Sequence, residues 1–532
     1  MIQKVAKNIR TMFLSAAQNV GLFVFTAFFV TGILCMEPMT WYRTQIDLVN
    51  QYVVLPWGMA LCLLRLERRR NALNDATRRD VQALFALLLW IVVPFVLRFG
   101  ITFNNVGAWY NHTVVYFGIY AFLSEMDGQE REKTFDLFVL LCGVMTFILS
   151  GALLYCAATA TTIYAGAQSI GFGLMDGAHI CHGVHYNLTG MLLTCLAMIS
   201  LAGVSRAKRL PLRVFFGISA LMALIVVVLT QSRTARYASL IALGAGVYGV
   251  IVGRAPIKKR AICQLTAIAA AVVVLVGGYI GAAKMTDAAL SHYADVRNQA
   301  QAMARAEKAK AQTVALAQES EPEETDGQAI SAQESAEQNA VEQNAAEQNA
   351  VEQAVAEEEK EVQADTAAQD VVVEEEMIEA KTARKAVDST FSDRTKIWQN
   401  LFNLWKEDIK YLFIGNGIGR TGSRVVEGTI HEKAGAVQLH NTYLQHTADF
   451  GLIGTALLAL FFALLVRPLL RVFFASGSRR KPGYTALVML VIAMLATGMM
   501  ESAPLGGFSP ANMMLFFALA LLAGRGKDIS AE

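Results

Sequence analysis

The sequence predicts an all-α polytopic membrane protein, and three observations support this fold class. Hydrophobic residues make up 54% of the 532 residues and charged residues only 17%, whereas a soluble protein needs about 25% charged residues. Apolar runs recur along the chain, many of them close to the about 20 residues that a helix needs to cross a bilayer. Basic residues fall mainly in alternate connections between these runs. A soluble protein of this size is therefore excluded.

Hydropathy predicts about twelve transmembrane helices. The second, eighth and twelfth are the shortest of them. The first run continues beyond twenty residues without a small-residue cleavage site, so we expect it to stay as a membrane anchor. The approximate ranges are 13–36, 51–66, 81–100, 107–124, 135–158, 187–204, 213–231, 237–253, 261–283, 444–466, 483–500 and 510–524.

Lysine and arginine residues give these helices an orientation, because basic loops stay in the cytoplasm. With the N-terminus inside, about 26 basic residues fall on the cytoplasmic side, and both termini are cytoplasmic. The short outer connections then hold only Arg43, Arg98, Arg233 and Arg236.

The predicted topology divides the chain into five parts. Residues 1–12 and 525–532 are cytoplasmic tails, 13–283 contain helices 1–9, and 442–524 contain helices 10–12. One large extracytoplasmic loop, 284–441, lies between helices 9 and 10.

The first half of this loop is of low complexity. Residues 298–385 consist mainly of Ala, Glu, Gln and Val, with a five-residue repeat from Ala336 to Gln353. A period of five matches no helical face, and the composition cannot bury enough apolar surface to offset chain entropy. We therefore predict a disordered insertion, with a wall-binding or spacer role as the alternative, followed by an ordered active-site part at 392–441.

The ordered part begins with a predicted helix. Ser392 or Asp393 would cap its N-terminus, and its two tryptophans suit a helix at the membrane interface. Such a helix would hold Arg394 close to the outer surface of the membrane. Its apolar stripe consists of Ile397, Leu401, Leu404, Trp405 and Ile409.

A glycine-rich segment follows this helix. Gly415, Asn416 and Gly417, continued by Ile418-Gly419, predict a tight loop. Such a loop either serves as a plain turn or presents its backbone N–H groups to a phosphate. Both interpretations stay open at this point.

Polar residues of the apolar helices gather at the predicted outer end, where ionisable groups are informative because they are unfavourable at membrane depth. Each one alone also fits an ordinary role, such as an arginine at lipid phosphate. Together they suit one chemistry: arginine forks bind a diphosphate without a metal, and a histidine takes a proton from an attacking hydroxyl. The set comprises Arg98, His182, His185, Asn187, Arg233, Arg236, His440, Asn441 and Glu501.

No metal or cofactor is expected. The seven cysteines form no C-x-x-C pair, so neither a disulfide framework nor a zinc site is indicated. Cys181, His182 and His185 have metal-ligand side chains, but we do not expect them to form a metal site.

Two stretches resemble the bacterial O-antigen ligase and O-antigen polymerase superfamily. One is T-Q-S-R-T-A-R-Y-A-S-L, from Thr230 to Leu240. The other combines R-T-K-I-W, I-G-N-G-I-G and H-N-T-Y-L-Q-H-T-A-D-F-G-L-I-G. The similarity covers about 225–255 and 390–460, whereas the first 180 residues agree only in hydropathy. The acidic insertion departs from the family pattern and is not expected to take part in chemistry.

The resemblance implies a metal-independent glycosyltransferase on the outer face of a bacterial cytoplasmic (inner) membrane. Such enzymes move a glycan from a polyprenyl diphosphate carrier to an acceptor hydroxyl, usually with inversion. Arg233 and Arg394 would neutralise the diphosphate and His440 would orient or deprotonate the hydroxyl, as catalytic residues. Substrate-binding assistance is implied for Arg236, Asn441, Gly415, Asn416 and Gly417. We add Arg98, His185 and Glu501 to the substrate-binding set from their position alone.

The expected partners are the lipid-linked glycan donor, a lipid, protein or glycan acceptor, and membrane lipids; no nucleic acid is expected. Three functions stay open: a ligase, a polymerase that extends the carrier-linked glycan, and a non-catalytic glycan transporter or flippase. Transporters place polar residues and broken helices near the midplane, often in repeated halves, and the sequence predicts neither.

Overall fold

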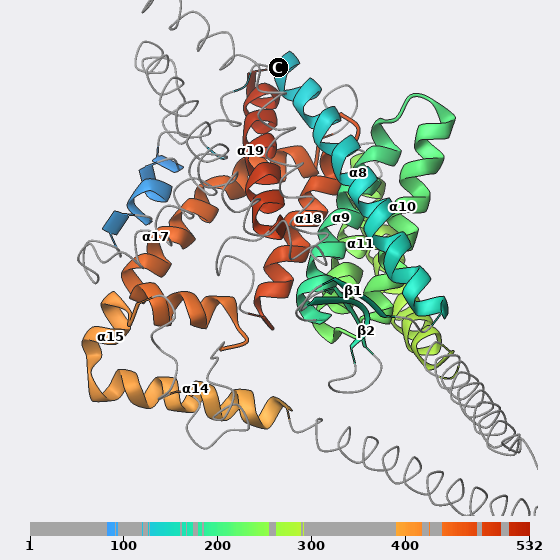
Figure 1. Cartoon of the computed structure of the whole chain (residues 1–532). Coiled ribbons are helices and arrows are strands. Elements are labelled where there is room, and N and C mark those ends of the chain that lie inside the picture. The colour runs from blue at the N-terminus through green and yellow to red at the C-terminus, as the bar shows by residue number, and fades with distance from the viewer. Residues whose placement is uncertain are drawn as a thin grey trace, which may run out of the picture. The chain divides into compact units, whose positions relative to one another are not determined.

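The structure is a computed structural model (Figure 1). Contacts divide the chain into two units, Met1–Val296 with Asp393–Glu532, and Arg297–Ser392. The contacts discussed below lie in the first unit. The structure describes residues 82–83, 85–90, 92–93, 120, 126, 128–159, 162–165, 168–173, 179–182, 186–254, 262–288, 291, 390–417, 425, 439–475, 481–501 and 510–531.

The described chain is mainly helical. Eight helices fall on predicted spans, and helical residues between 82 and 93 fall on the span predicted at 81–100. Six of those described are long and apolar enough to cross a membrane, and α18 and α19 add shorter apolar segments. A helical membrane protein is thus confirmed, while the count of twelve spans stays a prediction, because the spans at 13–36 and 51–66 lie outside the described residues and that at 107–124 is described only at residue 120. The eight helices are α8 (Gly128–Thr159), α9 (Tyr186–Arg206), α10 (Leu210–Leu229), α11 (Arg233–Arg254), Ile262–Ala288, α17 (Thr442–Phe473), α18 (Tyr484–Gly498) and α19 (Pro510–Ala531).

Helix α9 lies at the centre of the described bundle and is largely buried among α8, α10, α11 and α18. Small residues allow this close packing, since Gly143 of α8 and Gly203 of α9 both lie against the ring of Phe216. Hydroxyl groups also pair across helices: Thr194 lies 2.8 Å from Ser239 of α11. Close backbones and interhelical hydrogen bonds replace the hydrophobic effect, which is weak between helices in lipid.

A small antiparallel sheet between α8 and α9 is absent from the all-helical prediction. Its strands are β1 (Thr162–Ala165), β2 (Gln168–Gly173) and β3 (His179–His182), in the order β1-β2-β3. In its register Ile163 pairs with Ile170, and Ile170 pairs with His182. The strands are four to six residues long, too short for hydropathy to separate them from an ordinary connection.

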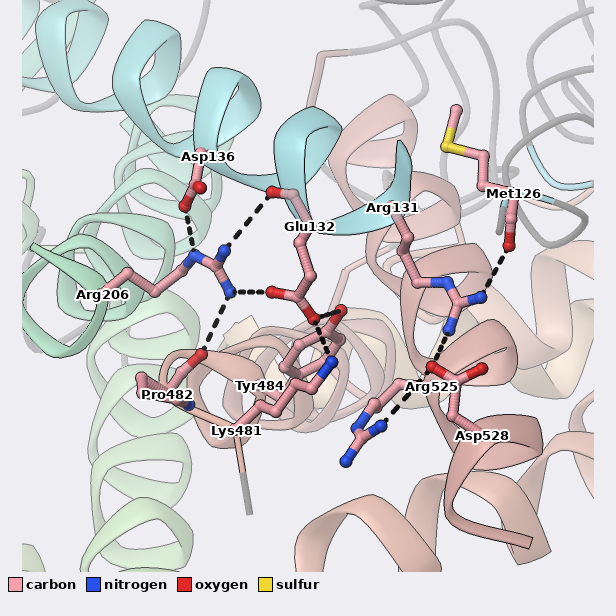
Figure 2. Close-up of polar contacts among 10 residues, drawn as sticks. All are labelled: Met126, Arg131, Glu132, Asp136, Arg206, Lys481, Pro482, Tyr484, Arg525 and Asp528. Atoms are coloured by element: carbon pink, nitrogen blue, oxygen red, sulfur yellow. Dashed lines mark hydrogen bonds and ion pairs between the residues drawn. The ribbon is translucent and has the colours of Figure 1, made fainter. Parts of the chain in front are cut away.

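Ion pairs and a hydrogen bond join four of these helices at one end of the bundle (Figure 2). Arg206 at the end of α9 binds Asp136 at 2.6 Å and Glu132 at 2.8 Å, both from the start of α8. Arg131 binds Asp528 of α19 at 2.6 Å, and the Tyr484 hydroxyl at the start of α18 donates to Glu132 at 3.0 Å. We call this set the basal cluster: Arg131, Glu132, Asp136, Arg206, Lys481, Tyr484, Arg525 and Asp528.

The basal cluster defines two ends for the helices. Helix α9 runs from Tyr186 to its basal end at Arg206, and α18 runs from its basal end at Tyr484 to Gly498. The basic residues of the cluster come from connections that the sequence placed on one side. The start of α9 and the end of α18 therefore lie at the opposite end of the bundle, which we call the distal end.

Candidate functional site

Helix α14 (Thr390–Glu407) precedes the site and matches the predicted helix, with two corrections. It begins at Thr390, so neither Ser392 nor Asp393 is its N-cap. The stripe of Ile397, Leu401, Leu404 and Trp405 is buried as predicted, but Ile409 is 60% exposed. The cause is a break at Asp408, whose side chain accepts a hydrogen bond from the Lys410 N–H and starts the short helix α15 (Ile409–Ile414).

The stripe of α14 packs against the protein. It forms an apolar cluster with Val425, Leu439 and Ala448, separate from the main core. Figure 1 shows α14 and α15 folding back toward the first turns of α17. This packing fixes Arg394, in the first half of α14, relative to the chain that enters α17.

The glycine loop after α15 uses its amides within the protein. The N–H of Gly415 donates to the Tyr411 carbonyl at 3.0 Å, that of Asn416 to Ala448 at 2.7 Å, and that of Gly417 to Asp449 at 3.1 Å. All three backbone donors are thus used within the protein in this structure, and a substrate-binding role for these residues stays a prediction. The segment is a structural turn that docks on α17.

The docking site is an interruption in α17, which the sequence analysis predicted to be continuous. Gly451 has a φ of 70° inside this helix. A non-helical residue releases carbonyl groups of the preceding turn, and in a membrane such groups need partners. The turn amides supply them at Ala448 and Asp449. The sequence did not predict this break, which is filled by protein.

The backbone around His440 is held on both sides. His440 has a φ of 49°, a left-handed conformation that is unfavourable for non-glycine residues. The Leu439 carbonyl accepts from Trp398 Nε1 at 2.8 Å, and the Leu439 N–H donates to Gln445 Oε1 at 3.0 Å. Asn441 caps α17 and donates through Nδ2 to the Met499 carbonyl at 3.0 Å. Such strain persists only where surrounding contacts impose it, as these do.

Glu501, which follows α18, brings three separate segments together. Its Oε1 accepts from Asn187 Nδ2 at 2.7 Å and lies 3.5 Å from Arg394 Nη2. Its Oε2 lies 3.5 Å from His440 Nδ1. Glu501 is 5% exposed, and a buried carboxylate needs such partners. We call Asn187, Arg394, His440 and Glu501 the Glu501 cluster.

The structure therefore brings together Arg394, His440 and Glu501, which the sequence placed at one end of the bundle. Arg394 is held twice, because its Nη1 also donates to the Met500 carbonyl at 3.1 Å. The group combines a guanidinium, an imidazole and a carboxylate at the distal end.

Arg233 and Arg236 lie on the first turn of α11, after a tight connection from α10 in which Gln231 has a φ of 54°. Arg233 is exposed, and Arg236 donates to the Gln231 carbonyl at 3.1 Å. This connection packs on the first turn of α9: a Cβ on Gly190 would lie 2.6 Å from that of Ala235. The same turn of α9 carries Asn187 of the Glu501 cluster. Convergence of Arg233 on the cluster stays a prediction.

Two predicted substrate-binding residues, Arg98 and His185, lie outside the described residues. Cys181 and His182, for which no metal site is expected, lie on strand β3, where only the backbone is described. Among the described residues, no group of three or more His, Cys, Asp or Glu side chains is placed to hold a metal ion.

Sequence reasoning missed several polar residues that support the site. Gln445 and Asp449 are buried in the first turns of α17, and Gln445 Nε2 donates to Asp449 Oδ2 at 3.0 Å. His446 is also buried and its ring stacks on Trp90, with centroids 5.4 Å apart. The available signal was a run of polar residues inside an apolar span, which usually marks function.

Comparison with known proteins identifies the segment that holds most of the site. The family model for O-antigen ligase (Wzy_C) matches residues 218–459. This range runs from α10 into α17 and includes Arg233, Arg394 and His440. Searches of curated proteins and of solved structures returned no match. Residues 218–459 are therefore similar to the O-antigen ligase family, whose members are membrane ligases and polymerases.

Proposed function

We propose that this protein is an O-antigen ligase-like glycosyltransferase that moves a glycan from a polyprenyl diphosphate carrier to an acceptor hydroxyl. The observation that carries this proposal is the Glu501 cluster. In it, Arg394 and His440 each face a different oxygen of one buried carboxylate. Two members of the cluster fall inside the family match. The first turn of α9, which carries Asn187, also packs against the connection that leads to Arg233.

In the proposed reaction, His440 accepts the proton of the acceptor hydroxyl as the oxygen attacks the anomeric carbon of the donor sugar. The bond between that carbon and the diphosphate oxygen breaks, and its electron pair leaves with the diphosphate. Attack from the opposite face gives inversion. Arg233 and Arg394 stabilise the leaving charge, with Arg236 assisting, a task that guanidinium groups perform without a divalent cation.

The orientation of the site suits a lipid-linked donor. The site lies at the distal end, and the basic residues of the basal cluster favour the cytoplasm for the other end. A site on the outer face of the inner membrane has no access to cytosolic nucleotide sugars. A polyprenyl diphosphate carrier delivers an activated glycan to that face.

A transfer assay tests this function. Full-length protein in nanodiscs receives lipid-linked glycan extracted from membranes of the producing bacterium, with EDTA present. We expect transfer by the wild type and none by His440→Ala or Arg233→Ala. Arg213→Ala is the matched control, because Arg213 is exposed at the basal end of α10. Size-exclusion chromatography verifies folding.

The outcomes separate the alternatives. Undiminished transfer by a folded His440→Ala or Arg233→Ala variant would remove that residue from the mechanism, and loss of transfer in EDTA would reject metal independence. A ladder of glycans still attached to the carrier would identify a polymerase. Glycan movement across vesicles without any new glycosidic bond would identify a transporter.

A further inference from the structure

We infer that Glu501 is a positioning residue for the transfer reaction: it holds His440 through Nδ1, so that Nε2 is left to accept the proton of the acceptor hydroxyl. This inference rests on the proposed function and assigns Glu501 a different task from the substrate-binding one expected from its position.

The charge of Glu501 argues against direct donor binding. A diphosphate and a carboxylate are both anionic, and like charges in a site shielded from water repel strongly. Glu501 is 5% exposed, and its oxygens already face Asn187, Arg394 and His440. The binding partners of the Glu501 carboxylate are therefore the protein side chains around it.

The two carboxylate oxygens have different partners. Oε1 accepts from Asn187 and faces Arg394, whereas Oε2 faces His440. A carboxylate beside one imidazole nitrogen fixes the proton on that nitrogen and leaves the other nitrogen unprotonated, as the proton acceptor. The 3.5 Å separation exceeds a formed hydrogen bond, and such catalytic contacts often tighten only when substrate binds.

Both partners are held in place by the backbone. The Glu501 N–H donates to the Thr497 carbonyl at 3.0 Å, and the Glu501 carbonyl accepts from Thr442 Oγ1 at 2.6 Å. Thr442 is the first residue of α17, two positions after His440. The end of α18 and the start of α17 therefore form one fixed frame for the carboxylate and the imidazole.

The proton balance is simple. The acceptor O–H bond breaks and its proton moves to His440 Nε2, which forms an imidazolium. Its Nδ1–H then donates to Glu501, which stays ionised and stabilises the new charge, as an orienting carboxylate does in other histidine-dependent transferases and hydrolases. The proton later leaves to solvent.

Glu501→Gln tests this role, because it keeps an oxygen for Asn187 and removes the charge. A general base contributes about 10²- to 10⁴-fold, so we expect kcat to fall at least about tenfold while KM for the lipid-linked glycan stays unchanged. Binding of undecaprenyl diphosphate, with the monophosphate as reference, should also be unchanged. Glu501→Asp should retain more activity than Glu501→Gln. Glu407→Gln, at the exposed end of α14, is the matched control.

Nitrogen NMR of protein labelled with ¹⁵N-histidine gives a second readout that needs no folded Glu501 variant. The His440 signal is identified by its loss in His440→Gln. At alkaline pH, where histidines are neutral, we expect the proton on Nδ1 in the wild type.

Three results would overturn the inference: a proton on Nε2 in the wild type, wild-type kcat in Glu501→Gln, or loss of undecaprenyl diphosphate binding in proportion to transfer. A wild-type protein that neither transfers glycan nor binds undecaprenyl diphosphate would instead reject the proposed function, and the NMR result would still test the contact between His440 and Glu501.

Discussion

The basal cluster and the Glu501 cluster lie at opposite ends of the same helices and differ in construction. In the basal cluster, Arg131 and Arg206 bind carboxylates at 2.6 to 2.8 Å (Figure 2). In the Glu501 cluster, the charged groups stand 3.5 Å apart. The first joins helix ends directly, whereas Arg394 and His440 of the second come from α14 and from the segment before α17.

The difference in contact distances indicates that the basal cluster stabilises the fold and that the Glu501 cluster takes part in the reaction. Arg206 donates hydrogen bonds to Asp136, to Glu132 and to the Pro482 carbonyl. Arg394 and His440 stand 3.5 Å from the Glu501 oxygens, and long contacts of this kind in catalytic sites often tighten when substrate binds. We therefore expect substitutions in the basal cluster to change stability and those in the Glu501 cluster to change transfer.

The largest effect is expected at Arg394. Arg394→Met should lower transfer about 10²- to 10³-fold, the loss typical of one removed electrostatic donor. The transfer rate of Arg394→Lys should lie between those of the wild type and Arg394→Met. Lysine keeps the charge but lacks the guanidinium fork that reaches both Met500 and Glu501. Initial rates of glycan transfer measure both variants. Wild-type transfer by Arg394→Met would show that Arg394 has a structural role, like Arg131 and Arg206. The proposed difference in role between the two clusters would then be wrong.

The converse effect is expected at Arg206. Arg206→Met should lower the free energy of unfolding by about 2 to 4 kcal/mol, because Glu132 and Asp136 lose a largely buried partner. Transfer per folded molecule should not change. Unfolding in mixed micelles measures stability, and exposed Lys208 gives the control variant Lys208→Met. A loss of specific activity without a loss of stability would contradict the assignment.

Substitution of Gln445 is expected to have a smaller effect, on both glycan transfer and stability. Gln445→Met removes the acceptor for the Leu439 N–H and the donor to Asp449. We expect about tenfold slower transfer, equivalent to about 1.4 kcal/mol, and a stability loss of about 1 kcal/mol. Exposed Gln399 of α14 provides the control Gln399→Met. Equal transfer by both variants would show that the strained conformation of His440 needs no such support.

The smallest effect is expected at Lys481. Its 3.4 Å pair with Glu132 is partly exposed, and exposed pairs contribute about 0 to 1 kcal/mol. Lys481→Ala should leave both unfolding and transfer close to wild type. A loss comparable to that of Arg206→Met would show that the cluster acts as one coupled network, which a double-mutant cycle would measure.

The sequence predicted the elements of the fold better than their contacts. The helical spans follow from hydropathy, since each apolar run must satisfy its own backbone in a membrane. The break at Gly451 and the short strands β1 to β3 were missed, because both depend on partners elsewhere in the chain. For the break, that partner is the turn at Gly415–Gly417.

The site was predicted in part. Arg394 and His440 were selected from the family resemblance and Glu501 from its position near the end of an apolar helix, and the structure places the three side chains together. For the glycine loop, a sequence shows which backbone amides exist but not which of them are already bonded within the protein. The pairing of Glu501 with Asn187, far away in the chain, has no signal in a single sequence.

The contact between the glycine turn and the break in α17 has a consequence for how this protein can evolve. Gly415 and Gly451 both have positive φ, and a Cβ on either would collide with backbone atoms of the other segment. A change at one glycine therefore has no compensating change at the other, because the obstacle is main chain rather than a side chain that could shrink. An alignment of relatives should show two invariant positions without covariation, and engineering of the insertion upstream of α14 should succeed only where this glycine pair is left intact.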